Sequence, residues 1–420
     1  MYYNNKKKYK FTFIDLFAGI GGFHQAMESL GGRCVFASEI DPECQRTYRN
    51  QFKMDVAGDI NKCINIIPSF DVLCGGFPCQ TFSKAGKQLG FEDKERGQLF
   101  FRIIDILKLH PECKFIILEN VRNLADDSKF WDVIQTELRK LNFYITREPL
   151  IKSPDDFGIP QNRERVYILG IKKELKDNSK VKNEWIELDD IDLTKEYKKC
   201  SDTTAFTILD LNNPRNNEYI ITKEEEKIIK AWEKFKKEIN PHNQLGAPIW
   251  LDFFGFEYNK KHDNEFYKSC DFRNMPVWKQ EFVLKNRNFY IDNKEKIDKW
   301  YCEHKNILTK KIYRKFEWNC GSEYQPFKNC IIQFRQSGLR IKRANKFPSL
   351  VAIINTPIIW DSKLNKYRRL TIREAANLQS FVSGFRFICD DRITYKQLGN
   401  SVNVKVIRNG KRKEASECGS

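Results

Sequence analysis

One cysteine, Cys79, stands in a sequence context that could make it a nucleophile. The apolar residues 72–75 before it predict a buried strand, and Gly75 and Gly76 allow the backbone to turn tightly where that strand ends. Pro78 then fixes one φ angle and favours an extended conformation for the residue before it. We therefore expect the thiol at the carboxyl edge of a sheet, where open α/β folds bind their ligands. On these residues alone, a structural thiol in a tight loop explains Cys79 equally well.

Two further strand ends carry side chains that could act together with this thiol. The apolar run 115–118 ends in the carboxylate of Glu119, and Arg163 and Arg165 lead into another apolar run. A free thiol has a pKa of about 8.5, so only a small fraction is thiolate near neutral pH, and a nearby guanidinium would raise that fraction. A thiol, a carboxylate and paired guanidinium groups at successive strand ends form a constellation of side chains that could share one site.

The beginning of the chain has the pattern of a nucleotide-binding sheet. A turn that contains Gly19 and Gly21 joins a strand to a helix and would let a ligand approach the backbone closely. Glu39 follows the next strand, where an acidic side chain can accept hydrogen bonds from a ribose diol. Asp59 could accept a hydrogen bond from an adenine amino group, and Ile60 offers an apolar wall. Two alternatives stay open. The glycine turn could only connect a strand to a helix without binding a ligand, and Asp59 could be a helix N-cap.

The order of elements predicts the fold class and its domains. Strands and helices alternate over residues 1–170, which predicts an open, mainly parallel α/β sheet. Residues 171–367 are rich in Lys, Asn and aromatic side chains and lose this alternation, so we expect a second, smaller and irregular domain there. Residues 368–407 return to the first domain, and residues 408–420 form a polar tail that we expect to be disordered.

Composition restricts the partners and the environment. The net charge of +17 predicts a polyanionic partner, above all nucleic acid. The chain has 13 cysteines and no Cys-x-x-Cys pair, so we expect neither a zinc ribbon nor a disulfide framework. We expect no metal site of another kind. No apolar run is long enough to span a membrane, and the first residues lack a signal core, so we expect a cytoplasmic protein.

A segment of the second domain has side chains suited to contact nucleic acid bases. Arg335, Gln336 and Arg340 stand around a glycine turn, and Arg and Gln are the side chains that bind base edges with two hydrogen bonds. A solvated basic hairpin is the alternative for these residues.

Taken together, these motifs resemble those of the C5 cytosine DNA methyltransferase family. Eight of them occur in the order usual for that family. They are Phe17-Ala18-Gly19, Glu39, Asp59, Pro78-Cys79, Glu119-Asn120-Val121, Gln161 with Arg163 and Arg165, Arg369-Leu370-Thr371, and Gly399-Asn400-Ser401-Val402. The resemblance covers residues 11–170 and 368–404, and residues 171–367 occupy the place of the variable target-recognition domain.

The resemblance implies a fold and a reaction. The expected fold is a Rossmann-like methyltransferase sheet that binds S-adenosyl-L-methionine (AdoMet), with S-adenosyl-L-homocysteine as product and no metal. The Cys79 thiolate would add to C6 of a cytosine flipped out of duplex DNA, and C5 would then take the methyl group. Glu119 would contact N3 and the exocyclic amine, Arg165 the O2 edge, and Arg163 would orient carboxylate or phosphate groups.

The resemblance also implies which residues of this sequence contact the cofactor and which contact DNA. For the cofactor they are Phe17, Gly19, Gly21, Glu39, Ile40, Asp59, Ile60, Pro78, Asn400, Ser401 and Val402. For DNA they are Ser83, Lys84 and Lys87, in a candidate closing loop at residues 80–97, together with Arg335, Gln336 and Arg340. We expect a monomer on DNA, associated with the bacterial nucleoid, as the modification enzyme of a restriction–modification system.

The sequence also departs from the family. After Ile407 the family continues into a long apolar helix that covers the cofactor, whereas this chain becomes polar. This departure leaves open a DNA-binding relative whose catalysis is impaired. A separate alternative is a tRNA cytosine-5 methyltransferase, which has the same fold and chemistry but another substrate.

Overall fold

The computed structural model describes residues 8–77, 98–126, 128–175, 181–182, 185–186, 204–243, 245–254, 270–350 and 356–409. The chain forms two compact units. The first consists of the described residues within Met1–Ser201, Pro348–Ile354 and Ile372–Ser420, and the second of those within Asp202–Phe347 and Asn355–Thr371. The sequence placed the second domain at residues 171–367, so the observed unit begins later along the chain and returns the short segment 348–354 to the first unit.

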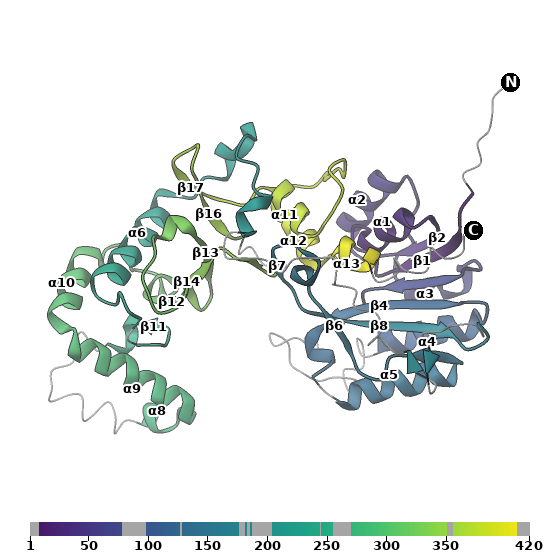
Figure 1. Cartoon of the computed structure of the whole chain (residues 1–420), viewed down its shortest axis with the longest axis horizontal. Helices are drawn as coiled ribbons and strands as arrows, with labels where there is room; N and C mark the ends of the chain where they lie inside the picture. Colours follow the sequence, from purple (N-terminus) through teal and green to yellow (C-terminus); the bar gives the residue numbers. More distant parts are fainter. Residues whose placement is uncertain are drawn as a thin grey trace. The chain divides into compact units, whose positions relative to one another are not determined.

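The first unit is built on a seven-stranded sheet with the strand order β2-β1-β3-β4-β8-β5, in which β6 also pairs with β8 (Figure 1). Its strands are β1 (Phe11–Leu16), β2 (Gly32–Ser38), β3 (Val72–Gly75), β4 (Phe115–Val121), β5 (Phe143–Ile145), β6 (Leu150–Lys152) and β8 (Arg165–Lys172). The pairs β1–β2, β1–β3 and β3–β4 are parallel, whereas β8 is antiparallel to β4, β5 and β6. The expected α/β sheet is present, and β8 is its reversed strand.

Helices cover both faces of this sheet because successive side chains of a strand point to opposite faces. Ile14 and Leu16 of β1 belong to one apolar core with side chains of α4 and α5. Phe13 faces the other way and contacts His24 of α1 edge-on, at 5.5 Å between ring centroids. The helices of this unit are α1 (Gly22–Ser29), α2 (Pro42–Phe52), α3 (Ile60–Cys63), α4 (Gln98–Leu109), α5 (Ser128–Lys140), α11 (Ile372–Leu378), α12 (Asp391–Asn400) and α13 (Val404–Asn409).

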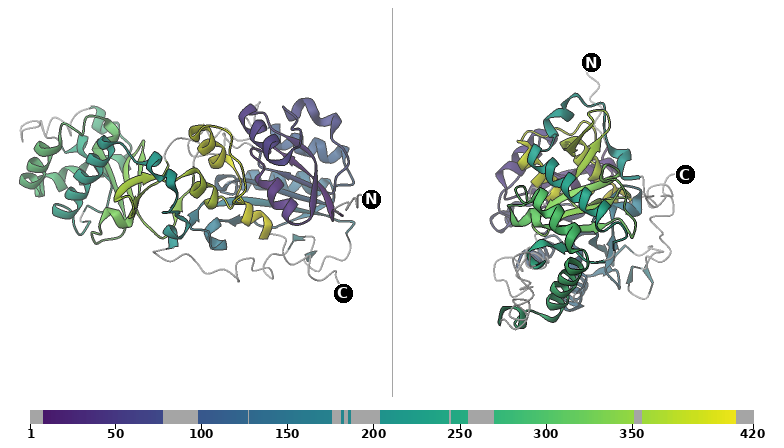
Figure 2. Two further views of the ribbon diagram at one scale, coloured as in Figure 1. Left: turned by 90° about the horizontal axis from the view of Figure 1, so that it is seen from above. Right: turned by 90° about the vertical axis from the view of Figure 1, so that its left-hand side faces the viewer.

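The second unit is more regular than its sequence indicated. It contains a six-stranded sheet with the order β11-β12-β14-β13-β16-β17. Its main elements are β11 (Ile249–Trp250), β12 (Lys315–Asn319), β13 (Cys330–Arg335), β14 (Gly338–Arg343), β16 (Ile358–Asp361), β17 (Lys366–Arg369), α6 (Lys223–Glu238), α8 (Cys270–Arg273), α9 (Val277–Asp292) and α10 (Lys294–His304). Trp232 of α6 and Trp300 of α10 pack with Phe316 of β12 in a buried aromatic core. Figure 2 shows these helices beside the strands.

Shorter strands complete the description: β7 (Gln161–Asn162), β9 (Val181–Lys182), β10 (Trp185–Ile186) and β15 (Phe347–Pro348). Within the described residues, no helix combines the length and the apolar character needed to cross a membrane.

A group of buried titratable side chains lies between β1, α1 and α2. His24 Nδ1 is 2.6 Å from the hydroxyl of Tyr48, and the imidazole stacks on Phe52 at 3.8 Å between centroids. Asp15 is fully buried, and burial raises the pKa of its carboxyl well above the ordinary value. Burial lowers the pKa of His24 to about 4. The fold therefore accommodates the neutral imidazole.

We predict that acid destabilises the protein partly through His24. The unfolded chain has the ordinary imidazole pKa of 6.5, so it takes up a proton before the folded protein does. Stability therefore falls as the pH drops from 6.5 towards 4, and at pH 5 this group alone costs about 2 kcal/mol. Asp15 contributes with the opposite sign, because its raised pKa favours the folded state at low pH.

The effect of His24 is isolated by comparing the unmutated protein with His24→Gln in urea unfolding at pH 7 and pH 5. The variant should lose less stability between the two pH values. Equal losses in the two proteins would contradict the assignment to His24.

Candidate active site

A buried ion pair joins two of the predicted catalytic residues at the carboxyl edge of the first sheet. Arg165 Nε lies 3.1 Å from Glu119 Oε1, and only 8% of Glu119 is exposed. The pair forms because β8 runs against β4, so that Val121 at the end of β4 is opposite Arg165 at the start of β8. A guanidinium at the start of a parallel strand would lie at the other edge of the sheet. The arrangement places a charge-balanced carboxylate at the sheet edge.

The backbone that leads to Cys79 passes next to this carboxylate. A Cβ atom at Gly76 would lie 3.6 Å from Glu119 Oε2 and 3.7 Å from a methyl group of Val402. Asn120 is buried and donates a hydrogen bond from Nδ2 to the carbonyl of Phe77, at 3.2 Å. Pro78 and Cys79 themselves lie outside the described residues. Gly76 thus lies beside Glu119, and the position of Cys79 relative to this carboxylate stays a prediction.

Arg163 has a different environment from the one that the sequence suggested. Its guanidinium donates hydrogen bonds to the hydroxyl of Ser349, the carbonyl of Leu350 and the carbonyl of Ser401, at 2.8 to 3.1 Å. These partners are backbone carbonyls and a hydroxyl, not the expected carboxylate or phosphate. Burial, with the charge of Arg165 nearby, lowers the pKa of Arg163 to about 9. The observed contacts of Arg163 hold together three distant segments of the first unit.

The predicted cofactor residues Gly19 and Glu39 are in direct contact. Glu39 accepts hydrogen bonds from the backbone N–H of Gly19 through Oε2 and of Asp41 through Oε1, both at 2.8 Å. Burial raises the pKa of Glu39, and the charge of Asp41 acts in the same direction. Ile40 between them is 72% exposed, so an apolar side chain projects from this turn. The turns after β1 and β2 are thereby fixed to each other.

The glycine turn after β1 has an unusual backbone. Phe17, Gly19 and Gly21 all have positive φ angles, of 54°, 54° and 87°. For Phe17, which has a Cβ atom, this conformation is uncommon, and such residues are found at ligand sites. A Cβ atom at Gly19 would meet nothing within 4 Å, whereas one at Gly21 would collide with the ring of Phe52. The space beside Gly19 is open, as a turn that receives a ligand requires.

Asp59 is the N-cap of α3, because its Oδ1 accepts a hydrogen bond from the backbone N–H of Asn61 at 3.0 Å. The sequence left open that Asp59 is a helix N-cap, and this alternative is confirmed. The contact of Asp59 with an adenine amino group stays a prediction. Ile60 is buried, and a backbone bridge between Ser38 and Ala57 holds the segment before Asp59 next to the end of β2.

The C-terminal motif reaches the same edge of the sheet. A Cβ atom at Gly22 would lie 2.7 Å from a methyl group of Val402 and 3.0 Å from the hydroxyl of Ser401. Asn400 is the last residue of α12, and the carbonyl of Ser401 accepts the hydrogen bond from Arg163. Ser401 and Val402 therefore lie against Gly22, directly after the glycine turn, and Val402 also lies beside Gly76 in the segment that leads to Cys79, whereas Asn400 is exposed. The short helix α13 follows, and residues 410–420 lie outside the described residues.

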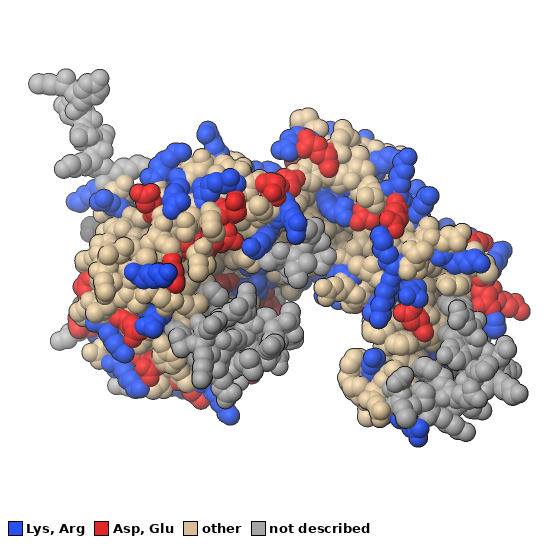
Figure 3. Space-filling view, turned by 180° about the vertical axis from the view of Figure 1, so that it is seen from behind, with Lys and Arg blue, Asp and Glu red and all other residues tan. Residues whose placement is uncertain are grey.

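The predicted DNA-binding residues fall into two groups. Ser83, Lys84 and Lys87, with the whole candidate loop 80–97, lie outside the described residues. In the second unit, Arg335 ends β13 and Gln336 is exposed in the hairpin that leads to β14. Arg340 is held by Glu317, to whose Oε2 its Nε donates, so it is less available than the sequence suggested. Figure 3 shows Lys and Arg spread over the surface with Asp and Glu among them.

Sequence reasoning missed several contacts that shape the site. The hydrogen bond from Asn120 to Phe77 could have been suspected, since Asn120 belongs to the Glu-Asn-Val motif and a buried carboxamide needs partners. The ion pair between Lys396 Nζ and Asp41 Oδ2, at 3.2 Å, had no such signal because the two residues are far apart in sequence.

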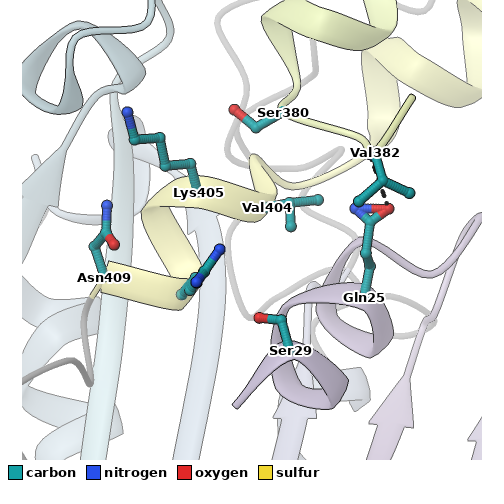
Figure 4. A pocket seen from close by; sticks show the side chains of 8 residues that line it. Gln25, Ser29, Ser380, Val382, Val404, Lys405 and Asn409 are labelled. Carbon is teal, nitrogen blue, oxygen red and sulfur yellow. Dashed lines mark hydrogen bonds between the residues drawn. The ribbon is translucent and has the colours of Figure 1, made fainter. Parts of the chain in front are cut away.

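A pocket of about 290 Å³ lies between α1 and α13, away from these contacts (Figure 4). It is lined by Gln25, Ser29, Ser380, Val382, Val404, Lys405, Arg408 and Asn409. None of the predicted catalytic or cofactor residues is among them, so we do not assign the pocket to this site.

Comparisons with known proteins agree with this geometry. A family model for the C-5 cytosine-specific DNA methylase matches residues 11–413. The type II methyltransferase M.DsaV of Dactylococcopsis salina is 32% identical over 406 residues, which cover 96% of this chain and 85% of that protein. The type II methyltransferase M.HpaII of Haemophilus parainfluenzae is 48% identical over 181 residues, which cover 42% of this chain and 50% of that protein.

Among solved structures, a prophage-encoded DNA modification methyltransferase from E. coli is similar in fold, with a TM-score of 0.52 and 19% identity over 95% of this chain and 96% of that one. The expected α/β methyltransferase fold and the family resemblance are both confirmed. The chain belongs to the C-5 cytosine-specific DNA methylase family.

Proposed function

We propose that the protein transfers a methyl group from AdoMet to C5 of cytosine in duplex DNA, as the modification enzyme of a restriction–modification system. The observation that carries this proposal is the buried pair of Glu119 and Arg165 beside the backbone that leads to Cys79. Such an enzyme acts on the DNA of the bacterial nucleoid, in the cytoplasm.

The chemistry explains why a thiol is needed at position 79. C5 of cytosine is too weak a nucleophile to take a methyl group unaided. When the Cys79 thiolate forms a bond to C6, the electron pair of the C5–C6 double bond moves to C5 and makes it nucleophilic. After C5 has been methylated, loss of the C5 proton and expulsion of the thiolate restore the ring. One difficult step is thus divided into easier ones.

Glu119 and Arg165 would make the ring accept this attack. Arg165 holds one carboxyl oxygen of Glu119, and the other oxygen lies on the side of Gly76. A carboxyl group that shares its proton with N3 draws electron density from the ring and makes C6 more electrophilic. The remaining donors of the Arg165 guanidinium would bind the O2 edge of the same base.

The residues at the ends of β1 and β2 fit AdoMet. Glu39 offers carboxylate oxygens to a ribose diol, the exposed Ile40 offers an apolar surface to adenine, and the open space beside Gly19 admits a ligand next to the backbone. Asp59 and residues 400–402 complete the candidate set. When bound there, AdoMet supplies an electrophilic methyl group, and these residues hold and orient it.

Access to C6 requires that the target cytosine leave the duplex, which costs a few kcal/mol that protein contacts must offset. We assign this task to the loop 80–97, with Ser83, Lys84 and Lys87, and to the second unit as the target-recognition domain. In that unit, Arg335 and Gln336 are the better candidates for base contacts, because Glu317 already holds Arg340. We propose that the protein acts as a monomer on DNA.

The first prediction concerns Cys79. With AdoMet present, duplex DNA that contains 5-fluorocytosine should form a covalent adduct with the protein, because fluorine at C5 cannot leave as a proton does. Cys79→Ala should form none, whereas Cys302→Ala, which removes an exposed thiol elsewhere, should form as much as the unmutated protein. The adduct is measured by denaturing gel electrophoresis.

A parallel assay uses tRNA that contains 5-fluorocytosine. An adduct with tRNA alone would favour an RNA substrate, and no adduct with either nucleic acid would favour an impaired DNA-binding relative. Bisulfite sequencing of DNA from cells that express the protein would then identify the methylated sequence.

The second prediction concerns Glu119. Glu119→Gln keeps the shape of the side chain but removes the acidic proton, so we expect the single-turnover rate of methyl transfer to fall by about 10²- to 10⁴-fold. Glu164→Gln is the matched control, since Glu164 is half-exposed and pairs with Arg122 at 2.6 Å next to the same strand. A rate for Glu119→Gln within twofold of this control would refute the assigned role.

The third prediction concerns Asn120. Asn120→Ala removes the hydrogen bond that holds the carbonyl of Phe77, two residues before Cys79, so the rate of adduct formation should fall about tenfold. AdoMet affinity should not change, because Asn120 is not among the candidate cofactor residues. Asn123→Ala, in the turn that follows β4, serves as control. An unchanged adduct rate would show that this hydrogen bond does not position the thiol.

A further inference from the structure

Helix α12 is attached to α2 at the edge where the candidate cofactor residues lie. Lys396 Nζ is 3.2 Å from Asp41 Oδ2, and Gln397 Nε2 donates to the carbonyl of Glu43 at 3.0 Å. Gln397 and Thr47 are both buried and bond to each other across the two helices. The buried side chain of Gln397 fixes how α12 packs on α2, and the neighbouring Lys396 places a positive charge at the exposed edge of this contact.

The partner of Lys396 belongs to the turn that Glu39 organises. The backbone N–H of Asp41 donates to Glu39 Oε1, and Asp41 Oδ1 caps α2 by accepting hydrogen bonds from Glu43 N and Cys44 N. Asp41 Oδ2 is the oxygen that Lys396 binds. The backbone N–H and the two carboxyl oxygens of Asp41 thus have different partners. The ion pair with Lys396 can therefore be removed by mutation while the N-cap of α2 is kept.

Lys396 also balances charge at this turn. Glu39 and Asp41 are two acidic residues one position apart, and the charge of Asp41 disfavours the ionised form of Glu39. Lys396 is the cation that forms an ion pair with this acidic turn in the described part of the chain. Its loss would leave the Asp41 carboxylate less stable as an anion and would free the turn beside Glu39, the residue proposed to accept hydrogen bonds from a ribose.

The same helix reaches the other end of the candidate cofactor site. α12 ends at Asn400, and the next two residues lie against Gly22, the first residue of α1, directly after the turn that follows β1. A helix of ten residues therefore contacts the turn after β2 through Lys396 and the turn after β1 through the segment that follows it. Its position links the two turns that would hold the two ends of the cofactor.

We propose that Lys396 is a positioning residue for the cofactor: its ion pair with Asp41 holds the turn 39–41 in the conformation that binds the ribose of AdoMet. This inference rests on the proposed AdoMet site. The pair is half-exposed, so its contribution is modest, and we expect its loss to weaken AdoMet binding about two- to fivefold.

The test measures the Kd of AdoMet by isothermal titration calorimetry with the full chain at 50 mM and at 1 M NaCl. Lys396→Met keeps the aliphatic stem and removes the charge, Lys396→Arg keeps the charge, and Asp41→Asn keeps the N-cap. Lys140→Met on α5 is the matched control, since Lys140 forms a comparable surface ion pair with Glu137 at 2.7 Å.

At low salt, Lys396→Met and Asp41→Asn should each raise the Kd about two- to fivefold, and the double variant should bind as either single variant does. Lys396→Arg should bind like the unmutated protein. At 1 M NaCl the differences in Kd between the variants and the unmutated protein should vanish, because salt screens an exposed ion pair. A difference in Kd that came from packing alone would persist at high salt. The kcat at saturating AdoMet should stay unchanged while its KM rises.

The outcomes separate this inference from the proposed function. If the unmutated protein binds AdoMet and Lys396→Met has the same Kd as Lys140→Met, the role of Lys396 is refuted while the cofactor site stands. If Lys396→Met weakens binding equally at both salt concentrations, the effect is one of packing, and the electrostatic role is likewise refuted. If the unmutated protein does not bind AdoMet, the cofactor site and the role of Lys396 fall together.

Discussion

The reversal of one strand is the constraint on which the rest of the site depends. A carboxylate as deeply buried as that of Glu119 needs a counter-charge close by, because an isolated ion away from water is costly. In a wholly parallel sheet, an arginine at the start of a strand would lie at the opposite edge from the end of β4. The antiparallel pairing of β8 with β4 places Arg165 opposite Val121 and thereby supplies the counter-charge. A shift of one residue in this register would turn Arg165 to the other face of the sheet.

Around this pair, the site is assembled from small residues and backbone groups. Gly76 lies beside the carboxyl group of Glu119 and beside Val402, both at the distance of an ordinary van der Waals contact from its Cβ position. Gly22 has no space for a Cβ atom because Val402 and Ser401 pack against it. Arg163 donates to backbone carbonyls of two segments, near residues 350 and 401, that the chain reaches much later. The geometry is therefore determined by close packing of turns more than by any single strong interaction.

The sequence was informative where the structure depends on local order. The strand before Cys79 and the strand that contains Glu119 both follow from short apolar patterns. Periodicity identifies a strand but not its direction, so the reversal of β8 could not be seen. The partners of Arg163 are backbone groups of remote segments, which no side-chain pattern reveals. Helix α9 was missed because apolar residues occupy opposite sides of it: Val283 is buried while Trp278 is 66% exposed, so no single apolar stripe marks it.

The first unit is completed by residues from the far end of the chain, and this has a consequence for how the protein is made. Gln25 of α1 accepts a hydrogen bond from the backbone of Val382, 357 positions later, and Lys396 meets Asp41 across a similar interval. On a ribosome, the turns after β1 and β2 emerge early but lack these partners until nearly all the rest has been synthesised. Contacts of such long sequence separation form slowly, because a large loop must close first. All strands of the first sheet are therefore translated before the second unit, whereas the packing of α11, α12 and α13 against them must wait for residues 372–409, so the turns that carry Gly19 and Glu39 reach their final packing late.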